Sequence, residues 1–196
     1  MRLRVIAGEF RSRFLKSVPG LDTRPTPDRL REALFNVLAP RIEGTVFLDA
    51  YAGTGAVGIE ALSRGARRAI FVERSRAAVE VIRDNLAALG IADRAEVFTG
   101  KATPVLERVT ADIVFLDPPY ALVKEYEQAL ATLGERAPGL VVVQHAFRQS
   151  LAESYGHLQR TRILRQGDNA LSFYSVVVGS TGTEDGVDAN ARRPMM

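Results

Sequence analysis

The sequence predicts an α/β fold with a doubly wound, mostly parallel sheet. Short apolar segments alternate along the chain with longer segments whose apolar residues recur at helical spacing. Strands that are separated by helices pair in parallel and are joined by right-handed crossovers. The last two apolar segments are separated only by residues 166–169, so they predict an antiparallel strand pair at the C-terminal edge.

The patterns predict one hairpin, seven strands and five helices along the chain. Residues 1–22 contain two alternating segments and predict a basic β-hairpin appendage. In 27–40, Leu30, Leu34 and Leu38 recur at helical spacing after Thr26, a suitable N-cap. The body of the chain, 23–179, predicts seven strands and four further helices in a Rossmann-like order, and the polar residues 180–196 predict a disordered tail. The strands are expected at 45–50, 67–73, 95–100, 111–117, 139–146, 158–165 and 170–178, and the helices at 56–65, 75–90, a short segment ending near 109, and 126–135.

Composition excludes several classes of protein. The 196 residues are 46% hydrophobic and 25% charged, which is typical of a folded globular domain. Cysteine is absent, so the chain has no disulfide, thiolate metal site or cysteine nucleophile, and no metal site is expected. No apolar run approaches the roughly 18 residues of a membrane span, and the first residues lack the apolar core of a signal peptide. We therefore expect a cytoplasmic protein, and nothing in the sequence demands more than a monomer.

Basic residues gather at the N-terminal end. Residues 1–31 contain eight Lys and Arg against three acids, a net charge of +5, whereas the remainder contains 18 basic and 20 acidic residues. A basic end on a near-neutral body is typical of contact with a polyanion. Arginines that keep a solvated hairpin soluble would give the same pattern, and charge alone does not choose between these interpretations.

The first predicted strand leads into a glycine-rich turn. Gly53, Gly55 and Gly58 form a G-x-G-x-x-G pattern, which is typical of dinucleotide sites but also of tight strand-to-helix turns. Asp49 lies at the end of the strand, where a dinucleotide would place its pyrophosphate at the helix N-terminus. A carboxylate there repels phosphate and favours a cationic ligand. S-adenosylmethionine, which carries an ammonium and a sulfonium group, fits this site better than NAD.

The next two predicted strands also end in candidate ligand contacts. Glu73 ends the second strand about 20 residues further on, where an acid accepts hydrogen bonds from ribose hydroxyls. This role is shared by NAD and S-adenosylmethionine sites, and a solvated acid at a helix start is the alternative. Lys101 and Ala102 follow the third strand, and we expect their backbone groups to lie beside the adenine.

The fourth predicted strand ends in Asp117, Pro118, Pro119 and Tyr120. The Asp117 carboxylate and the Pro118 carbonyl can accept the two N–H groups of an exocyclic amine and turn its lone pair toward a methyl donor. The two prolines fix that carbonyl, because proline locks its own φ and restricts the residue before it. Tyr120 offers a face on which a base can stack. Neither of the two histidines, His145 and His157, is needed for this chemistry, and both are interpreted as structural.

Several motifs resemble a known family. "DPPY" together with "LDAYAGTGAVGIEAL" resembles the class I S-adenosylmethionine-dependent methyltransferases that act on exocyclic amines of nucleobases. "RVIAGEFRSRFL", "TRPTPDRLREALFNVLAP" and "ALSRGA" are similar to the bacterial RsmD-type enzymes, which methylate guanine N2 in 16S ribosomal RNA. The resemblance extends to about Val178 and implies the fold expected above.

The resemblance implies three sets of site residues. The catalytic set is Asp117, Pro118, Pro119 and Tyr120. The cofactor set, for S-adenosylmethionine, is Asp49, Tyr51, Gly53, Thr54, Gly55, Glu73, Arg74, Lys101, Ala102 and Asp117. The RNA-binding set is Arg4, Arg11, Arg13, Lys16, Arg24, Thr26 and Arg31, of which Arg24 and Thr26 are expected to close over the cofactor or the base. Phe10 and Phe14 would stack on exposed bases of 16S rRNA, free or in an assembling small subunit.

Two positions depart from the family pattern, and other functions remain open. Lys101 stands where many relatives carry Asp or Asn, and Gln166 stands where the family often has tyrosine before the glycine of the last turn. A DNA adenine-N6 or protein glutamine methyltransferase would use the same chemistry. An NAD-dependent oxidoreductase would use the glycine pattern, and a non-catalytic RNA-binding module would need no methyl donor.

Overall fold

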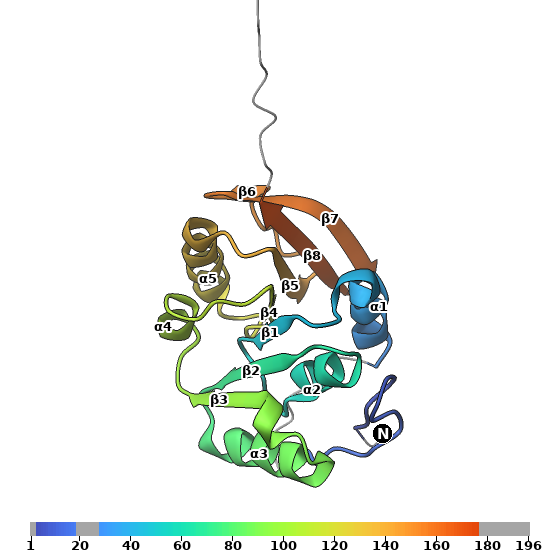
Figure 1. Ribbon diagram of the computed structural model, residues 1–196. Helices are drawn as coiled ribbons and strands as arrows, with labels where there is room; N and C mark the ends of the chain where they lie inside the picture. Colours follow the sequence, from blue (N-terminus) through green and yellow to red (C-terminus); the bar gives the residue numbers. More distant parts are fainter. Residues whose placement is uncertain (1–2, 19–27, 177–196) are drawn as a thin grey trace, which may run out of the picture.

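The computed structural model describes residues 3–18 and 28–176. Within these residues a single mixed sheet of eight strands has the order β3-β2-β1-β4-β5-β8-β7-β6 (Figure 1). The strands are β1 (Val46–Asp49), β2 (Arg68–Glu73), β3 (Ala95–Thr99), β4 (Ile113–Leu116), β5 (Leu140–Ala146), β6 (Ser154–Tyr155), β7 (Leu158–Gln166) and β8 (Asn169–Val176). The helices are α1 (Asp28–Leu38), α2 (Ala56–Ser63), α3 (Arg76–Leu89), α4 (Thr103–Leu106) and α5 (Val123–Arg136), with 3₁₀ turns η1 (Ala39–Arg41) and η2 (Ala92–Arg94).

The pairing confirms the predicted fold class. Strands β1 to β5 pair in parallel, and β8 and β7 add in antiparallel fashion next to β5. The two-residue strand β6 is an eighth strand that the sequence pattern did not predict, because two residues are too few for a periodic signal. Chain order reverses between β1 and β4, which makes the carboxyl ends of these strands the switch point where ligands bind in such sheets.

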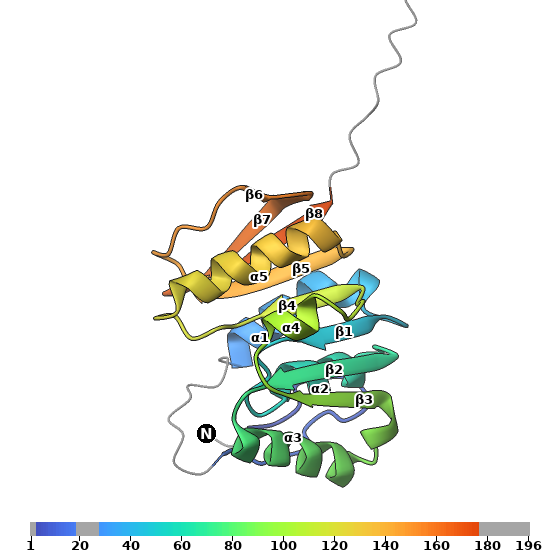
Figure 2. The same cartoon turned by 90° about the vertical axis from the view of Figure 1, so that its left-hand side faces the viewer.

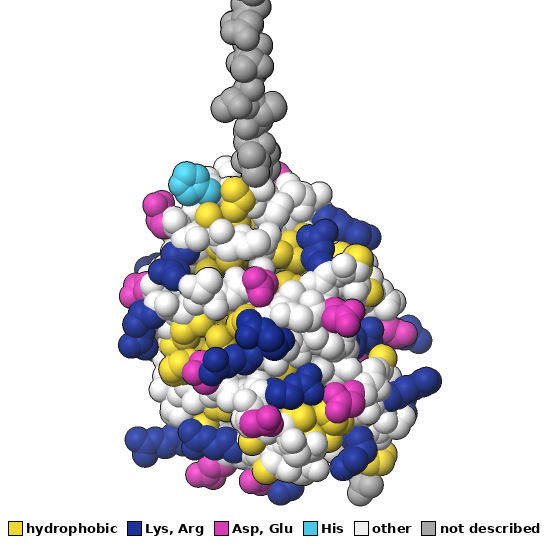
Figure 3. Space-filling view, in the orientation of Figure 1, with side chains coloured by type: hydrophobic (Ala, Val, Ile, Leu, Met, Phe, Trp, Pro, Cys, Tyr) yellow, Lys and Arg dark blue, Asp and Glu magenta, His cyan; other side chains and the backbone are white. Residues whose placement is uncertain are grey.

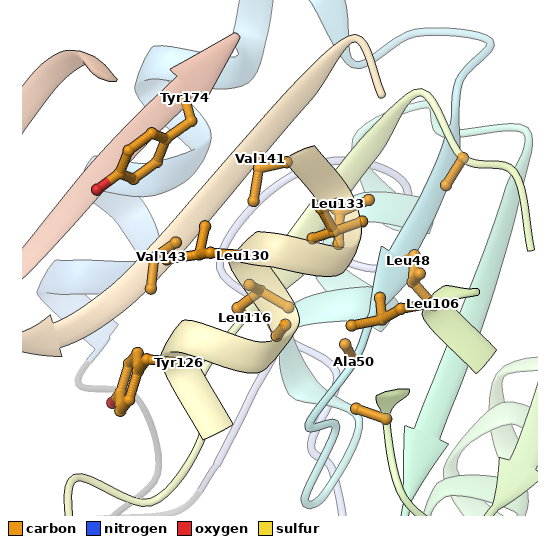
Figure 4. Packing of buried hydrophobic residues seen from close by; sticks show 14 of the residues in the cluster. Leu48, Ala50, Leu106, Leu116, Tyr126, Leu130, Leu133, Val141, Val143 and Tyr174 are labelled. Atoms are coloured by element: carbon orange, nitrogen blue, oxygen red, sulfur yellow. The ribbon is translucent and has the colours of Figure 1, made fainter. Parts of the chain in front are cut away.

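Helices cover both faces of the sheet. In Figure 2, α5 and α4 lie in front of the strands, and α1 and α2 lie behind them. The period of two in each strand divides the buried residues, so that Phe47 of β1 packs toward α1 and α2 while Leu48 packs toward α4 and α5. Figure 4 shows Leu130 and Leu133 of α5 beside Val141 and Val143 of β5. These cores hold the strand ends, and therefore the loops that follow them, in fixed positions.

The described N-terminal residues, 3–18, form an arm that folds back on itself. Their ladder consists of one antiparallel bridge between Arg4 and Phe14, so the arm is less regular than the expected β-hairpin. Val5, Phe10 and Leu15 are buried in a cluster shared with α2, α3 and β2. The arm is therefore packed against the body of the fold. No helix among the described residues is long and apolar enough to cross a membrane.

Candidate active site

The loop between β1 and α2 needs its glycines for backbone reasons. Gly55 precedes the first residue of α2 with a φ of 79°, in the left-handed region that favours glycine. A Cβ on Gly58 would lie 2.3 Å from the Phe71 ring, so only glycine lets α2 approach β2 this closely. Backbone conformation thus explains Gly55 and packing explains Gly58, and the ligand must be inferred from the charged groups around the loop.

Asp49 is buried below this loop. Its Oδ2 accepts a hydrogen bond of 3.0 Å from the backbone N–H of Gly58, in the first turn of α2. Burial raises the pKa of Asp49 to about 7, and the Gly58 N–H opposes that rise because it stabilises the ionised form. A positive charge close to this buried carboxyl group would stabilise its ionised form.

Glu73, at the end of β2, also holds the loop. One carboxylate oxygen accepts the backbone N–H of Gly53 at 2.9 Å and the other accepts that of Ser75 at 2.7 Å. The side chain is half-buried and borders a cavity. Each carboxylate oxygen has a further lone pair, so Glu73 can still accept from a ribose hydroxyl, and the expected ribose contact stays a prediction.

A cavity of about 670 Å³ lies at the carboxyl ends of the parallel strands. Its size is within the range of small-molecule sites. Except for Gly55, it is lined by every residue of the expected catalytic and cofactor sets: Asp49, Tyr51, Gly53, Thr54, Glu73, Arg74, Lys101, Ala102, Asp117, Pro118, Pro119 and Tyr120. The structure therefore brings residues from four separate loops to one site, and their binding roles stay predictions.

The turn that follows β4 is held from beneath by Tyr126. The hydroxyl of this buried side chain donates a hydrogen bond of 2.8 Å to the carbonyl oxygen of Pro118. Figure 4 shows the Tyr126 hydroxyl pointing away from the other labelled core side chains. Burial raises the pKa of Tyr126 far above its ordinary value, so the hydroxyl remains protonated and can donate. The orientation of the Pro118 carbonyl is therefore set by α5 as well as by the proline rings.

The Tyr120 side chain is held by residues of β5 and β8. Its ring is 39% exposed, and its hydroxyl donates to Asn169 Oδ1 at 2.7 Å. Gln144 Nε2 lies 3.5 Å from the same hydroxyl. Both amide side chains line the cavity. The expected stacking platform is thus fixed at its outer end.

The two histidines lie outside this cavity. His145 is buried, with Nε2 2.8 Å from Ser172 Oγ and Nδ1 2.9 Å from the Ala146 carbonyl oxygen. Burial lowers its pKa, so the ring is neutral near pH 7. The contact with Ser172 joins β5 to β8, which agrees with the structural role expected for His145. His157 is exposed between β6 and β7.

Four of the residues expected to contact RNA lie on the arm surface. Arg4, Arg11, Arg13 and Lys16 are exposed, and Lys16 Nζ forms an ion pair of 2.8 Å with Asp84. None of the four lines the cavity. Arg24 and Thr26 fall outside the described residues, so their expected closure over the site stays a prediction.

The prediction that Arg31 contacts RNA is wrong for this structure. Arg31 is fully buried, and its Nη2 donates to the Arg4 carbonyl oxygen at 2.6 Å and to Asp28 Oδ1 at 3.1 Å. The buried carboxylate of Glu60 lies 3.8 Å from Arg31 Nε. Arg31 therefore attaches the arm to α1 instead of meeting solvent.

Phe10 requires a similar correction, because it is 9% exposed and packs in the core below the arm. It cannot stack on a base without leaving that core. Phe14 is 64% exposed and retains the surface position that stacking requires.

The end of the arm is joined to the cofactor loop by Asn85 of α3. The Asn85 Oδ1 accepts the backbone N–H of Lys16 at 2.8 Å, while its Nδ2 donates to the carbonyl oxygens of Lys16 and Thr54, both at 3.2 Å. Val18, two residues further on, lines the cavity. One buried amide thus connects the surface arm with the edge of the site.

Sequence reasoning missed four of these contributors: Tyr126, Gln144, Asn169 and Asn85. Tyr126 has helical spacing and resembles any core aromatic residue, so no sequence signal identifies the target of its hydroxyl. Gln144 did carry a signal, because it is a polar residue that follows four apolar residues near the carboxyl end of β5. The same reasoning that selected Asp117 after β4 applies to Gln144 in β5.

The chain is similar in sequence to several known proteins. YlbH of Bacillus subtilis is 37% identical over 183 residues, which are 88% of this chain and 98% of YlbH. Ribosomal RNA small subunit methyltransferase D of Escherichia coli K12 is 43% identical over 121 residues, 61% of each chain. The protein of the same name from Haemophilus influenzae is 38% identical over 138 residues, 68% of this chain and 71% of that protein.

Solved structures share the fold. That of yhhF from Escherichia coli has a TM-score of 0.79 and 33% identity, over 89% of this chain and 97% of that chain. An RNA methyltransferase from Salinibacter ruber in complex with S-adenosyl-L-homocysteine has a TM-score of 0.59 at 19% identity, over 78% of this chain and 93% of that chain, a likeness of fold alone. The family described as conserved hypothetical protein 95 matches residues 3–175, and the chain therefore belongs to this family, that of the RsmD-type methyltransferases.

Proposed function

We propose that this chain transfers a methyl group from S-adenosylmethionine to the exocyclic N2 of a guanine in 16S ribosomal RNA. Membership of the family makes it an S-adenosylmethionine-dependent rRNA methyltransferase. The finer assignment, to 16S rRNA and to guanine N2, is supported by the resemblance of its motifs and by the site. One observation carries the proposal: the acceptor pair of Asp117 and Pro118 shares a cavity with Asp49 and Glu73.

The acidic side chains that line the cavity fit S-adenosylmethionine and not a dinucleotide. Asp49 already accepts the N–H of Gly58 at the start of α2, so a pyrophosphate there would meet a carboxyl group in place of a free donor. Asp49 and Glu73 suit the cationic and ribose parts of S-adenosylmethionine, respectively. When bound, this cofactor would supply the methyl group from its sulfonium sulfur, which would leave as a neutral thioether as the S–C bond breaks and the N–C bond forms.

The protein contributes positioning and electrostatics. The Asp117 carboxylate and the Pro118 carbonyl oxygen accept the two N–H groups of the amine, which turns its lone pair toward the methyl carbon. Tyr120 fixes the plane of the base. After transfer the amine nitrogen carries an extra proton, which passes to Asp117 or to water. No histidine takes part.

A transfer assay tests the proposal. Purified chain and tritiated S-adenosylmethionine are offered 16S RNA, partly assembled small subunits and duplex DNA, and the labelled nucleoside is identified. We expect label in N2-methylguanosine. Label in N6-methyladenine would keep the chemistry and reject the base, whereas label in a protein glutamine of the subunits would reject RNA as substrate.

The catalytic assignment is tested in the same assay. Asp117→Ala should lower single-turnover transfer by about 100-fold or more, because the amine loses its charged acceptor. The dissociation constant for the cofactor should stay within about 3-fold of the wild-type value, since the loops after β1, β2 and β3 supply most of the expected cofactor contacts. Asp93→Ala, an exposed acid in η2, serves as the matched control. Wild-type turnover in Asp117→Ala would reject the role in holding the amine.

A further inference from the structure

The cavity continues beyond β4, on the side away from the cofactor loop. The sheet order places β5 and then β8 there, and Ala146 of β5 pairs with Asn169 of β8 at the same edge of the sheet. Gln144 of β5 and Asn169 of β8 line this part of the cavity next to Tyr120. With the cofactor on the side of β1 and β2, this part remains for the acceptor base.

Gln144 has an unsatisfied acceptor in this wall. Its side chain is 4% exposed, and Oε1 has no hydrogen-bond partner among the described residues. Its Nε2 contacts the Tyr120 hydroxyl only at 3.5 Å, near the limit for a hydrogen bond. Buried acceptors are seldom left unpaired, and those that are need an explanation such as a bound donor. Because Nε2 faces the Tyr120 hydroxyl, Oε1 is the amide atom that remains to accept a hydrogen bond from a ligand.

Guanine differs from adenine and cytosine, the other two bases with an exocyclic amine, in the ring atom beside that amine. Next to N2 on the Watson–Crick edge, guanine carries N1–H, a donor. Next to the amines of adenine and cytosine lie ring nitrogens without hydrogen, which are acceptors. An acceptor on the protein beside the amine site therefore favours guanine, because a base of either other kind would leave two acceptors facing each other.

We propose that Gln144 is a specificity-determining residue whose Oε1 accepts the N1–H of the target guanine while Asp117 and Pro118 hold its N2. Asn169 is a positioning residue in this arrangement, because its Oδ1 holds the Tyr120 hydroxyl at 2.7 Å and so fixes the ring beneath the base. The inference rests on the proposed function and adds to it the way in which the base is chosen.

The experiment compares two bases that carry the same amine. The probe is the small-subunit RNA fragment that the wild-type chain methylates, with guanine or 2-aminopurine at the methylated nucleotide. The analogue keeps the 2-amine but has a bare N1. Single-turnover transfer is measured for wild type, for Gln144→Met, which removes the amide at similar volume, and for Gln144→Glu, which keeps an acceptor and removes the donor.

We expect wild type to prefer guanine by about 10- to 100-fold. Gln144→Met should lose most of that preference, through slower transfer to guanine and little change with 2-aminopurine, and Gln144→Glu should keep it. Gln149→Met is the matched control, since Gln149 also has a buried unpaired amide atom but does not line the cavity. It should behave as wild type, and cofactor affinity should stay within about 2-fold in all variants.

The possible results distinguish failure of the role of Gln144 from failure of the proposed function. If wild type methylates guanine N2 and Gln144→Met keeps the full preference, or Gln144→Glu loses it, the role of Gln144 is overturned while the proposed function stands. If wild type labels no RNA, or labels a base other than guanine, the proposed function fails and the inference fails with it.

Discussion

Asp49 ends β1 with a buried carboxyl group whose pKa burial raises to about 7. A cationic cofactor binds the ionised form, so binding should be accompanied by loss of a proton near neutral pH. This follows from the sign of the shift, because a raised pKa means that a large fraction of Asp49 is protonated in the free protein at pH 7.

We therefore predict that the affinity for S-adenosylmethionine decreases as the pH falls through 7. With an apparent pKa of about 7, the dissociation constant at pH 6 should be about 5-fold larger than at pH 7, a range in which the cofactor's ammonium group stays largely charged. Titration calorimetry in matched buffers measures this. Asp49→Asn can still accept the Gly58 N–H but has no charge, so its weaker binding should lose this pH dependence. An equal pH dependence in both proteins would assign the titration to the ligand.

Tyr126 gives a second prediction for a single hydroxyl group. Tyr126→Phe removes the hydrogen bond to Pro118 and should slow single-turnover transfer about 5- to 10-fold, near the value of one buried hydrogen bond. Cofactor affinity should not change. Tyr155→Phe, which removes a hydroxyl bonded to Glu127 in the same core, controls for stability. If both variants lose the same activity, Tyr126 has only a structural role.

At the scale of elements, the N-terminal arm is held by contacts with residues that are distant in the sequence. Glu60 of α2 is fully buried and accepts the backbone N–H groups of Ile6 at 2.8 Å and Ala7 at 3.0 Å. It also pairs with Arg64 at 2.7 Å and lies near buried Arg31. One carboxylate thus joins the arm, α1 and α2.

Glu60→Ala should destabilise the protein by about 3–5 kcal/mol, because it leaves the Arg31 charge buried with a weaker partner and two arm N–H groups unpaired. The free energy of unfolding in denaturant measures this. Glu80→Ala removes an exposed acid of α3 and should change it by less than about 0.5 kcal/mol. A similarly small effect at Glu60 would show that the arm is held by apolar packing alone.

The elements that the sequence predicted well are those with strong local periodicity. The parallel strands, α3 with its Ser75 cap, and the β7–β8 pair all lie close to their expected ranges. Arg31 shows why the remainder could not be predicted. A charge in an amphipathic helix indicates a solvated face unless a partner is known, and Glu60 is far away along the chain. For the site, strand ends identified the cavity residues, whereas Tyr126 and Asn85 act through hydrogen bonds that only tertiary structure defines.

At the scale of the whole molecule, charge is distributed in a mixed pattern. On the face drawn in Figure 3, basic side chains are interspersed with acidic ones. The net charge of +3 is small, and the excess of basic residues lies in 1–31. Attraction for RNA should therefore depend on a few residues of the arm more than on the overall field.

Replacing Arg11 and Arg13 with alanine should weaken RNA binding and reduce its salt dependence. If each arginine contacts a phosphate, the slope of log affinity against log salt concentration should fall by about 1.5. Arg41 and Arg67 provide an exposed control pair near the amino ends of β1 and β2, and replacing them should leave the slope unchanged. Equal effects from both pairs would mean that the arm is not a specific docking surface.

Asn85 has a consequence for the order of events on the RNA. Its amide forms hydrogen bonds with Lys16 of the arm and with Thr54 of the cofactor loop. A shift of one of these segments should therefore displace the other. Thermodynamic linkage then requires reciprocity: if RNA on the arm tightens cofactor binding by some factor, the cofactor tightens RNA binding by the same factor. After transfer, the demethylated cofactor lacks the sulfonium charge and would hold the loop less firmly. Once either the modified RNA or the spent cofactor has left, the other would then be bound more weakly.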